Sequence, residues 1–350
     1  MRATWRAAAL ILIGCSIGHQ CLADEKVINL KPVNVSGKFE GKKDKTAVDI
    51  SGISCLPPDG DTRTCLLVND ENKNAQFATF DAKKNELKVG QTVKLIGKNP
   101  TPETTLGTAP DVPCKGGDDG FKDLDGEGVA YAASMFYVVG SHGCSRKSDE
   151  FRLSSFILAQ VSADSAHTVV TTYRVSEMLK KSDKVSSYFG KALDGGNGLN
   201  IEGIATIGDK LWVGLRAPVT KDGDAYLVNA SISELFRAGH DPAVTTIQTM
   251  GIKLEGRGIR DLAPLPDGRI LVLAGPAQDQ DVSYKLYIAN PATKQDTSLG
   301  TLESISQDGT AGKAEGLTVL DVAGNKAKFL VVFDGLKNGD PHSGEVDLPN

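Results

Sequence analysis

The chain has 350 residues, of which 40% are hydrophobic and 24% charged, and its formal net charge is −5. This composition is that of an ordinary globular protein and excludes a fibrous or low-complexity chain. The acidic balance argues against a nucleic-acid partner, which would require a basic surface. The 38 glycines and the low aromatic content of 6% favour an all-β fold with many tight turns.

The first 23 residues have the pattern of a secretory signal peptide. Arg2 and Arg6 form a charged start, Ala7–Ile13 is a short apolar core, and Cys21–Ala23 ends in a small residue suited to cleavage. Removing this segment takes away two basic residues and no acidic ones, so the net charge of −5 becomes −7. We therefore expect residues 24–350 to form the mature protein, exported to the periplasm or the cell exterior.

A second interpretation of the same segment stays open. The sequence Leu12–Cys15 resembles a bacterial lipoprotein box, in which Cys15 would be acylated and the protein anchored. No later segment is long and apolar enough to predict a transmembrane helix.

Residues 24–350 contain a repeated β-hairpin. The segment Lys26–Glu40 alternates apolar and polar residues and predicts one or two strands before the first repeat. In chain order the hairpins are Val48–Ile53 with Leu66–Asp70, Glu127–Tyr131 with Phe136–His142, Ile201–Ile207 with Leu211–Leu215, Ile259–Ala263 with Ile270–Pro276, and Ala314–Leu320 with Phe329–Gly335. About two further strands follow each hairpin, among them the segment Arg152–Val161, and Ser176–Phe189 predicts a helix.

Four antiparallel strands per repeat are typical of a β-propeller blade. We therefore predict a single propeller domain over residues 24–350, with about five four-stranded blades. The last repeat lacks one or two strands, which the N-terminal strand can supply to close the ring. A sixth blade within the insertion Gly97–Gly126 or the helical region is one alternative, and a set of stacked β-sandwiches is another. We expect a monomer.

Four cysteines remain after the signal, an even number that suggests two disulfides in an exported chain. Centring the first hairpin near Gly60 places Cys55 opposite Cys65. This pairing leaves Cys114 to pair with Cys144. The alternative is that these cysteines are unrelated buried thiols.

The hairpin ends predict a polar rim around the central channel. The first strands begin at the acidic residues Asp49, Glu127, Glu202, Asp261 and Glu315. The second strands end at or beside Asp70, Glu71, His142, Arg216 and Asp334. Antiparallel pairing brings both sets to the same end of the blades, together with Arg260.

Three interpretations of this rim remain open. In the first, the carboxylates pair with Arg216 and Arg260 and only hold the ring together. In the second, the acidic residues at the first-strand starts bind Ca²⁺, which prefers oxygen ligands. In the third, the rim binds a small or anionic ligand through its arginines, or is catalytic with His142 as a general base.

Five motif pairs resemble the bacterial family known as domain of unknown function 3616. They are D-I-S-G-I with L-V-N-D-E, E-G-V-A-Y with F-Y-V-V-G-S-H, L-N-I-E-G-I-A with V-G-L-R-A-P, G-I-R-D-L-A with L-A-G-P, and E-G-L with V-V-F-D-G. The resemblance implies an exported propeller-like protein and supplies no activity. The hairpin starts are more loosely similar to those of phytase-like esterase propellers and Ca²⁺-binding lactonase propellers.

The sequence thus predicts an exported binding propeller whose rim takes a small or anionic ligand, with Ca²⁺ as a candidate cofactor. Its alternative is a metal-dependent hydrolase, either a phytase-like esterase or phosphoesterase or a lactonase-like enzyme.

Overall fold

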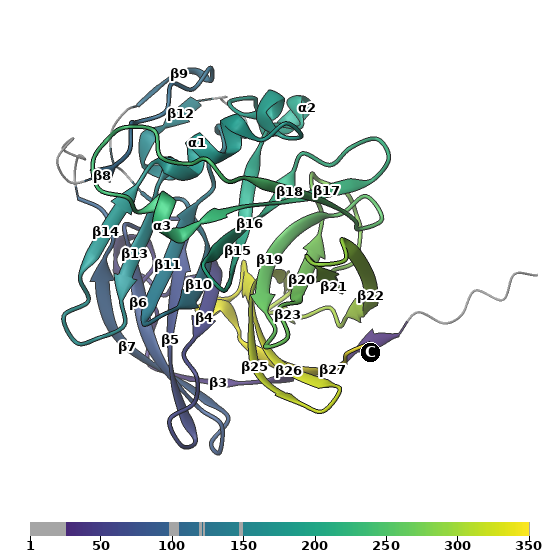
Figure 1. Cartoon of the computed structure of the whole chain (residues 1–350). Coiled ribbons are helices and arrows are strands. Elements are labelled where there is room, and N and C mark those ends of the chain that lie inside the picture. Colours follow the sequence, from purple (N-terminus) through teal and green to yellow (C-terminus); the bar gives the residue numbers. More distant parts are fainter. Residues whose placement is uncertain (1–25, 98–104, 119–120, 122, 147–149, 350) are drawn as a thin grey trace, which may run out of the picture.

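The structure is a computed structural model that describes residues 26–97, 105–118, 121, 123–146 and 150–349. The signal-peptide and lipoprotein predictions concern residues outside these ranges. Five sheets surround a central channel as the blades of a propeller, and their innermost strands converge at its centre (Figure 1). This arrangement confirms the prediction of five blades over the alternatives of six blades or stacked sandwiches.

The first two blades are joined by the long insertion. Blade 1 contains β4 (Ile50–Cys55), β5 (Thr62–Asn69), β6 (Asn74–Asp81) and β7 (Glu86–Lys94). Blade 2 contains β10 (Gly126–Ala132), β11 (Met135–Gly140), β13 (Leu158–Ser162) and β14 (Val169–Thr172), and β8 (Thr105–Leu106) adds a parallel strand at its outer edge.

The remaining three blades follow directly along the chain. Blade 3 contains β15 (Asn200–Ile207), β16 (Lys210–Ala217), β17 (Asp224–Ser231) and β18 (Gln248–Lys253). Blade 4 contains β19 (Gly258–Pro264), β20 (Ile270–Gly275), β21 (Lys285–Asn290) and β22 (Gln295–Leu302). Blade 5 contains β25 (Lys313–Ala323), β26 (Lys326–Asp334) and β27 (His342–Asp347).

The N-terminal segment closes the ring, as predicted, and it does so across three blades. Its β2 (Leu30–Pro32) pairs antiparallel with β27 and becomes the fourth strand of blade 5. On either side, β1 (Val27–Ile28) pairs in parallel with β22 of blade 4, and β3 (Asn34–Ser36) pairs in parallel with β7 of blade 1. The segment therefore covers the outer strand edges of three neighbouring blades, which would otherwise lie open to pairing with other chains.

Short elements lie between the blades. The helices are α1 (Arg174–Lys181), α2 (Leu193–Gly196) and α3 (Ile232–Leu235), with 3-10 turns at Lys42–Asp44, Leu153–Phe156, Ser186–Tyr188 and Lys337–Gly339. Two small ribbons are formed by β9 (Lys115–Asp118) with β12 (Glu150–Arg152) and by β23 (Ser306–Gln307) with β24 (Thr310–Ala311).

Two predicted elements are shorter than expected. The helix predicted over Ser176–Phe189 ends at Lys181, where the hydroxyl of the buried Ser182 lies 2.7 Å from that of Thr249 and the backbone turns extended. The strand predicted over Arg152–Val161 is interrupted because Ser155 Oγ donates to the carbonyl of Arg152 at 2.9 Å, a local bond that competes with the ladder.

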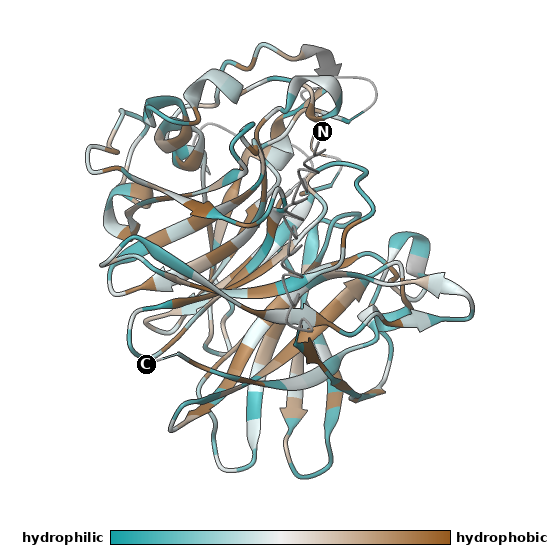
Figure 2. Ribbon diagram, turned by 90° about the vertical axis from the view of Figure 1, so that its right-hand side faces the viewer, coloured by the Kyte–Doolittle hydropathy of each residue, from teal (hydrophilic) through white to brown (hydrophobic). Residues whose placement is uncertain are grey.

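The core is divided among the interfaces between blades. Five clusters of buried apolar side chains each draw residues from two neighbouring blades, and together they run around the ring. Figure 2 shows the corresponding pattern, with hydrophobic colour along the strands and hydrophilic colour at many of the turns. Strand alternation therefore places apolar side chains between blades and leaves polar residues for the channel mouth and the surface.

Both predicted disulfides are present. Cys55 and Cys65 face each other in the ladder of blade 1 and are bonded, and Cys114 is bonded to Cys144 in the loop after β11. Disulfides of this kind indicate an oxidising environment, consistent with export. Within the described ranges, every helix is too short or too polar to cross a membrane.

The five innermost strands approach each other closely at one repeated position. Each of them has a bulge near its start, and the residue after the bulged one is Gly52, Gly128, Gly203, Asp261 or Gly316. A Cβ atom on Gly203 would lie 2.5 Å from Cα of Asp261, and one on Gly128 would lie 3.1 Å from the carbonyl oxygen of Glu202. Glycine is therefore required at positions such as Gly128 and Gly203 so that these blades can meet around the channel, and blade 4 alone has another residue, Asp261, at this position.

This requirement predicts that Gly203→Ala destabilises the protein by at least about 1–3 kcal/mol, because the added methyl group overpacks the ring. Gly251→Ala on β18 is the matched control, since its Cβ would meet its nearest neighbour at an ordinary 3.6 Å. Urea unfolding of both variants tests the prediction, and equal midpoints for the two variants would contradict it.

Candidate functional site

The bulged residues of the five innermost strands form the polar ring at the channel mouth. In blade order they are Ser51, Glu127, Glu202, Arg260 and Glu315. Three of them are the predicted rim acids. In blades 1 and 4 the bulge shifts the register, so that Ser51 takes the place expected for Asp49, and Arg260 takes the place expected for Asp261.

Arg260 connects three blades through buried ion pairs. Its Nη2 lies 3.2 Å from Oε2 of Glu202 in blade 3 and also contacts Oε1 of Glu315 in blade 5. Arg216 binds the other oxygen of Glu202, with Nη1 2.9 Å from Oε1, and its Nε donates to the carbonyl of Ala277 at 3.1 Å. The side chains of Arg260 and Glu202 are each only 3% exposed, so this ion pair is buried.

Asp261 ties blade 4 to blade 5 from the neighbouring position. Its carboxylate accepts hydrogen bonds from the backbone N–H of Leu262 at 2.8 Å and of Leu317 at 2.6 Å. Burial raises its pKa, and these two backbone bonds oppose that shift. Both carboxylate oxygens are thus engaged with the backbone, unlike a carboxylate that faces an open site.

The opposite side of the channel mouth carries carboxyl groups in excess of cations. Burial, reinforced by Glu202, Asp125 and Asp70, raises the pKa of Glu127 well above its usual value. Burial also raises the pKa of Asp125, whose carboxylate accepts a hydrogen bond from the Ser141 hydroxyl. The pKa of Asp70 rises to about 9, because of burial first and then the charges of Asp125 and Asp49. Such shifted carboxyls in a cleft are typical of functional sites.

The other predicted rim acids surround this group. Asp49 is half-buried beside Glu71, and burial together with Glu71 raises its pKa to about 6. Asp334 lies 2.6 Å from Lys313 Nζ at the end of blade 5. Burial raises the pKa of Glu315 to about 7 despite the opposing charge of Arg260.

His142 lies behind the mouth and faces the protein interior. It is fully buried, its Nδ1 donates to the carbonyl of Gly140 at 2.9 Å, and its ring lies 5.5 Å from that of Phe156. Burial lowers its pKa to about 4, although the bond to Gly140 partly offsets this. The ring is therefore uncharged at neutral pH, and Nε2 has no hydrogen-bond partner within the described residues.

A pocket of about 230 Å³ opens at the channel mouth between blades 2 and 3, here called the mouth pocket. It is bounded by the starts of β10 and β15, the end of β16 and the loop that follows β11. Its charged lining consists of the carboxyl groups of Asp125, Glu127, Glu150 and Glu202 and the guanidinium groups of Arg146, Arg152 and Arg216. His142 is not among the lining residues, although its neighbours Ser141 and Gly143 are.

Sequence reasoning had not identified three charged groups of this lining, namely Arg146, Glu150 and Arg152. Arg146 lies in the loop after β11, and Glu150 and Arg152 lie in β12, which is too short to show a periodic pattern. Arg152 lies 3.1 Å from Asp123, and Arg146 lies 2.8 Å from Asp279 across the mouth. Within the described ranges, no three His, Cys, Asp or Glu side chains converge in the manner of a metal site.

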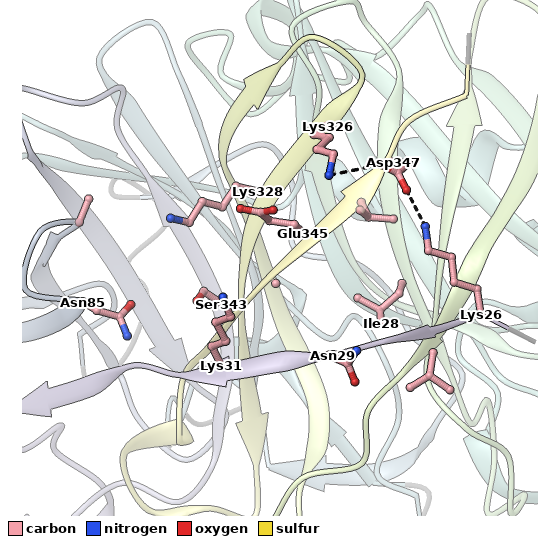
Figure 3. A pocket seen from close by; sticks show the side chains of 14 residues that line it. Lys26, Ile28, Asn29, Lys31, Asn85, Lys326, Lys328, Ser343, Glu345 and Asp347 are labelled. Carbon is pink, nitrogen blue, oxygen red and sulfur yellow. Dashed lines mark hydrogen bonds and ion pairs between the residues drawn. The ribbon is translucent and has the colours of Figure 1, made fainter.

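A second pocket, of about 480 Å³, lies away from the channel at the outer edge of blade 5, and we call it the seam pocket (Figure 3). It forms where the N-terminal segment crosses β26 and β27. Lys26 and Lys326 both reach Asp347, at 2.8 and 3.9 Å, while Lys31 and Lys328 are exposed. Exposed lysines over a strand seam resemble an ordinary charged surface, so the mouth pocket is the better candidate site.

The fold and the mouth together define a five-bladed β-propeller with a charged, partly buried channel entrance. A profile of the family described as "Protein of unknown function (DUF3616)" matches residues 158–344, more than half of the chain. The chain belongs to this family, as its motifs had indicated. No curated protein matches the chain.

Several solved structures are similar in architecture. The β-1,3-galactosidase BT3683 of family GH43 is 10% identical, with a TM-score of 0.47 and coverage of 89% of this chain and 94% of that one. The α-L-arabinofuranosidase PaAbf62A from Podospora anserina is 12% identical, with a TM-score of 0.46 and coverages of 93% and 97%. Hydrazine synthase from Kuenenia stuttgartiensis is 13% identical, with a TM-score of 0.38, and the chain spans 60% of its length. Identities this low carry no information about a shared activity.

Replacing Arg260 with methionine should cost about 3–5 kcal/mol of unfolding free energy, because Glu315 would be left as a buried carboxylate without its guanidinium partner. The measurement is urea unfolding at pH 7. The double variant Arg260→Met with Glu315→Gln should recover part of the loss, since the amide carries no charge. A single variant as stable as the wild type would show that these ion pairs do not hold the ring.

Asp70 predicts a specific pH dependence of stability. Its pKa rises from 3.8 to about 9 on folding, so between these values the folded state binds more protons and unfolding free energy falls as pH rises. Its stabilising contribution is complete below about pH 4 and lost by about pH 9. The Asp70→Asn variant should therefore gain stability over the wild type progressively from pH 5 to 9.

Thermal or urea unfolding of this variant at several pH values measures the effect, with the exposed Asp183→Asn as control. Parallel stability profiles for the wild type and Asp70→Asn would rule out the buried-carboxyl explanation.

Proposed function

We propose that the protein is an exported, monomeric β-propeller that binds a small anionic ligand in the mouth pocket. The observation that carries this proposal is that three arginines, Arg146, Arg152 and Arg216, line one pocket of about 230 Å³. Guanidinium groups bind carboxylates and phosphates through charge-assisted hydrogen bonds. The volume suits a compact ligand.

Of the three arginines, Arg216 is the one whose side chain is most firmly held in position for binding. Its side chain is 14% exposed, and it is held by Glu202 and by the carbonyl of Ala277 before any ligand arrives. A group that is already oriented loses little conformational entropy on binding. Arg260 contributes indirectly, since it shares Glu202 with Arg216 and so fixes the carboxylate that positions the ligand-binding guanidinium.

Two of the four carboxyl groups in the lining, those of Asp125 and Glu127, are compatible with an anion because their burial raises their pKa. Because their pKa values are raised, Asp125 and Glu127 remain protonated at higher pH than ordinary carboxyl groups do. A protonated carboxyl repels an anion less and can donate a hydrogen bond to it. Rising pH removes these protons, so we expect anion affinity to fall as the solution becomes alkaline.

Thermal melting with increasing inorganic phosphate, citrate or galacturonate tests the proposal, since a ligand that binds only the folded state raises the melting temperature. We expect at least one of these anions to raise it for the wild type, and Arg216→Gln to weaken binding by about tenfold or more. The exposed Arg237→Gln, outside the pocket lining, is the charge-matched control and should bind as the wild type does. Glu127→Gln should retain binding and reduce its pH dependence.

The same experiment addresses the alternative, a Ca²⁺-dependent hydrolase. That alternative draws on Glu127, a carboxyl 9% exposed for which no cationic partner is found among the described residues. A melting temperature that rises with Ca²⁺, falls with EDTA and no longer responds in Glu127→Gln would favour it over anion binding. Size-exclusion chromatography with light scattering would test the monomer.

A further inference from the structure

A further pocket, distinct from the seam pocket, adjoins the mouth pocket and lies on the same face of the propeller. It has a volume of about 640 Å³ and is formed by four loops of blades 3 and 4, at residues 194–197, 219–223, 256 and 277–280. We call it the loop pocket. Both pockets open at the end of the blades where the first strands begin and the second strands end.

The wall between the two pockets consists of specific side-chain contacts. Arg146, from the mouth pocket, lies 2.8 Å from Asp279 and 3.7 Å from Asp194, which both line the loop pocket. Arg216 donates to the carbonyl of Ala277 at 3.1 Å, and Gln278 Nε2 donates to the carbonyl of Leu193 at 3.0 Å. The pockets therefore lie side by side, separated by side chains that contact each other.

The lining of the loop pocket differs in chemistry from that of the mouth pocket. Its polar side chains include the amides and hydroxyl of Asn197, Thr220, Gln278 and Gln280, beside the carboxylates of Asp194 and Asp279. Lys221 is exposed at the tip of the β16–β17 loop and is the cation of this lining that has no carboxylate partner among the described residues. Amides and hydroxyls suit a ligand rich in hydroxyl groups, and a lysine suits a further anionic group.

We propose that the two pockets are consecutive subsites for an elongated acidic, polyhydroxylated ligand, an oligomer of sugar acids. One acidic unit lies in the mouth pocket against Arg216, and the next extends over the wall toward Lys221. Arg146 stands where the two units join, and its guanidinium can exchange Asp279 for the ligand. This inference rests on the proposed function, because it assumes that the mouth pocket binds the first acidic group.

The proposal predicts that affinity depends on ligand length. Calorimetric titration would compare galacturonic acid with its α-1,4-linked dimer and trimer. For the wild type we expect the dimer or trimer to bind at least about tenfold more tightly than the monomer, since the second unit binds intramolecularly once the first is held. Lys221→Gln should lose most of this gain and leave the monomer's affinity unchanged.

The control is Lys328→Gln, which removes the same charge from an exposed lysine of the seam pocket and should change neither affinity (Figure 3). Equal affinity for all three lengths would overturn the two-subsite proposal, and so would a gain in affinity with length that Lys221→Gln retains. The proposed function would still stand in either case if Arg216→Gln lost binding. If the protein binds phosphate or citrate but none of the galacturonates, the proposed ligand class is wrong and the proposed function stands. If none of these anions binds, the proposed function fails and the inference fails with it.

Discussion

The structure depends on how closely five strands can approach around one channel. At each bulge the backbone of one blade meets the next, and a Cβ atom on Gly203 would lie 2.5 Å from Cα of Asp261. Four blades meet this constraint with glycine. Blade 4 has Asp261 instead, and its carboxylate binds the backbone N–H of Leu317 in blade 5. The close approach also constrains the bulged residue that precedes each of these positions. That residue faces the channel mouth and must therefore be polar.

The channel mouth has two electrostatic halves as a result. Toward blades 3 to 5, Arg260 and Arg216 share Glu202, and Arg260 also contacts Glu315, so these groups neutralise one another at low exposure. Toward blades 1 and 2, the carboxyls of Asp70, Asp125 and Glu127 lie without such partners, and burial raises their pKa values. The ion pairs of the first half are those that the structural interpretation of the rim requires. The raised pKa values of the second half are typical of carboxyl groups in functional sites.

Much of this architecture could be predicted from the sequence, because hairpins with alternating apolar residues and glycine-containing turns are local signals. The same local geometry placed Cys55 opposite Cys65. The register at the rim could not be predicted in every blade, since a bulge inserts one residue and exchanges which neighbour faces the channel. For this reason Glu127, Glu202 and Glu315 were identified directly, whereas Asp49 and Asp261 each lie one or two positions away from the channel-facing residue. Arg146 comes from a loop and Arg152 from the short β12, and their positions depend on contacts with Asp279 and Asp123 that are distant in sequence.

The polar ring at the centre of the propeller also orients residues of the proposed binding site. Glu202 forms an ion pair with Arg260 through one oxygen and accepts a hydrogen bond from Arg216 on the other, so the contact that joins blades 3 and 4 also orients the guanidinium of Arg216. Arg216 in turn reaches the carbonyl of Ala277, on the wall of the loop pocket. A change at Arg260 would therefore reach the proposed ligand through Glu202 and Arg216 without direct contact. In this proposal stability and recognition are coupled through one buried carboxylate, so that a structural ion pair and a binding site occupy the same few residues.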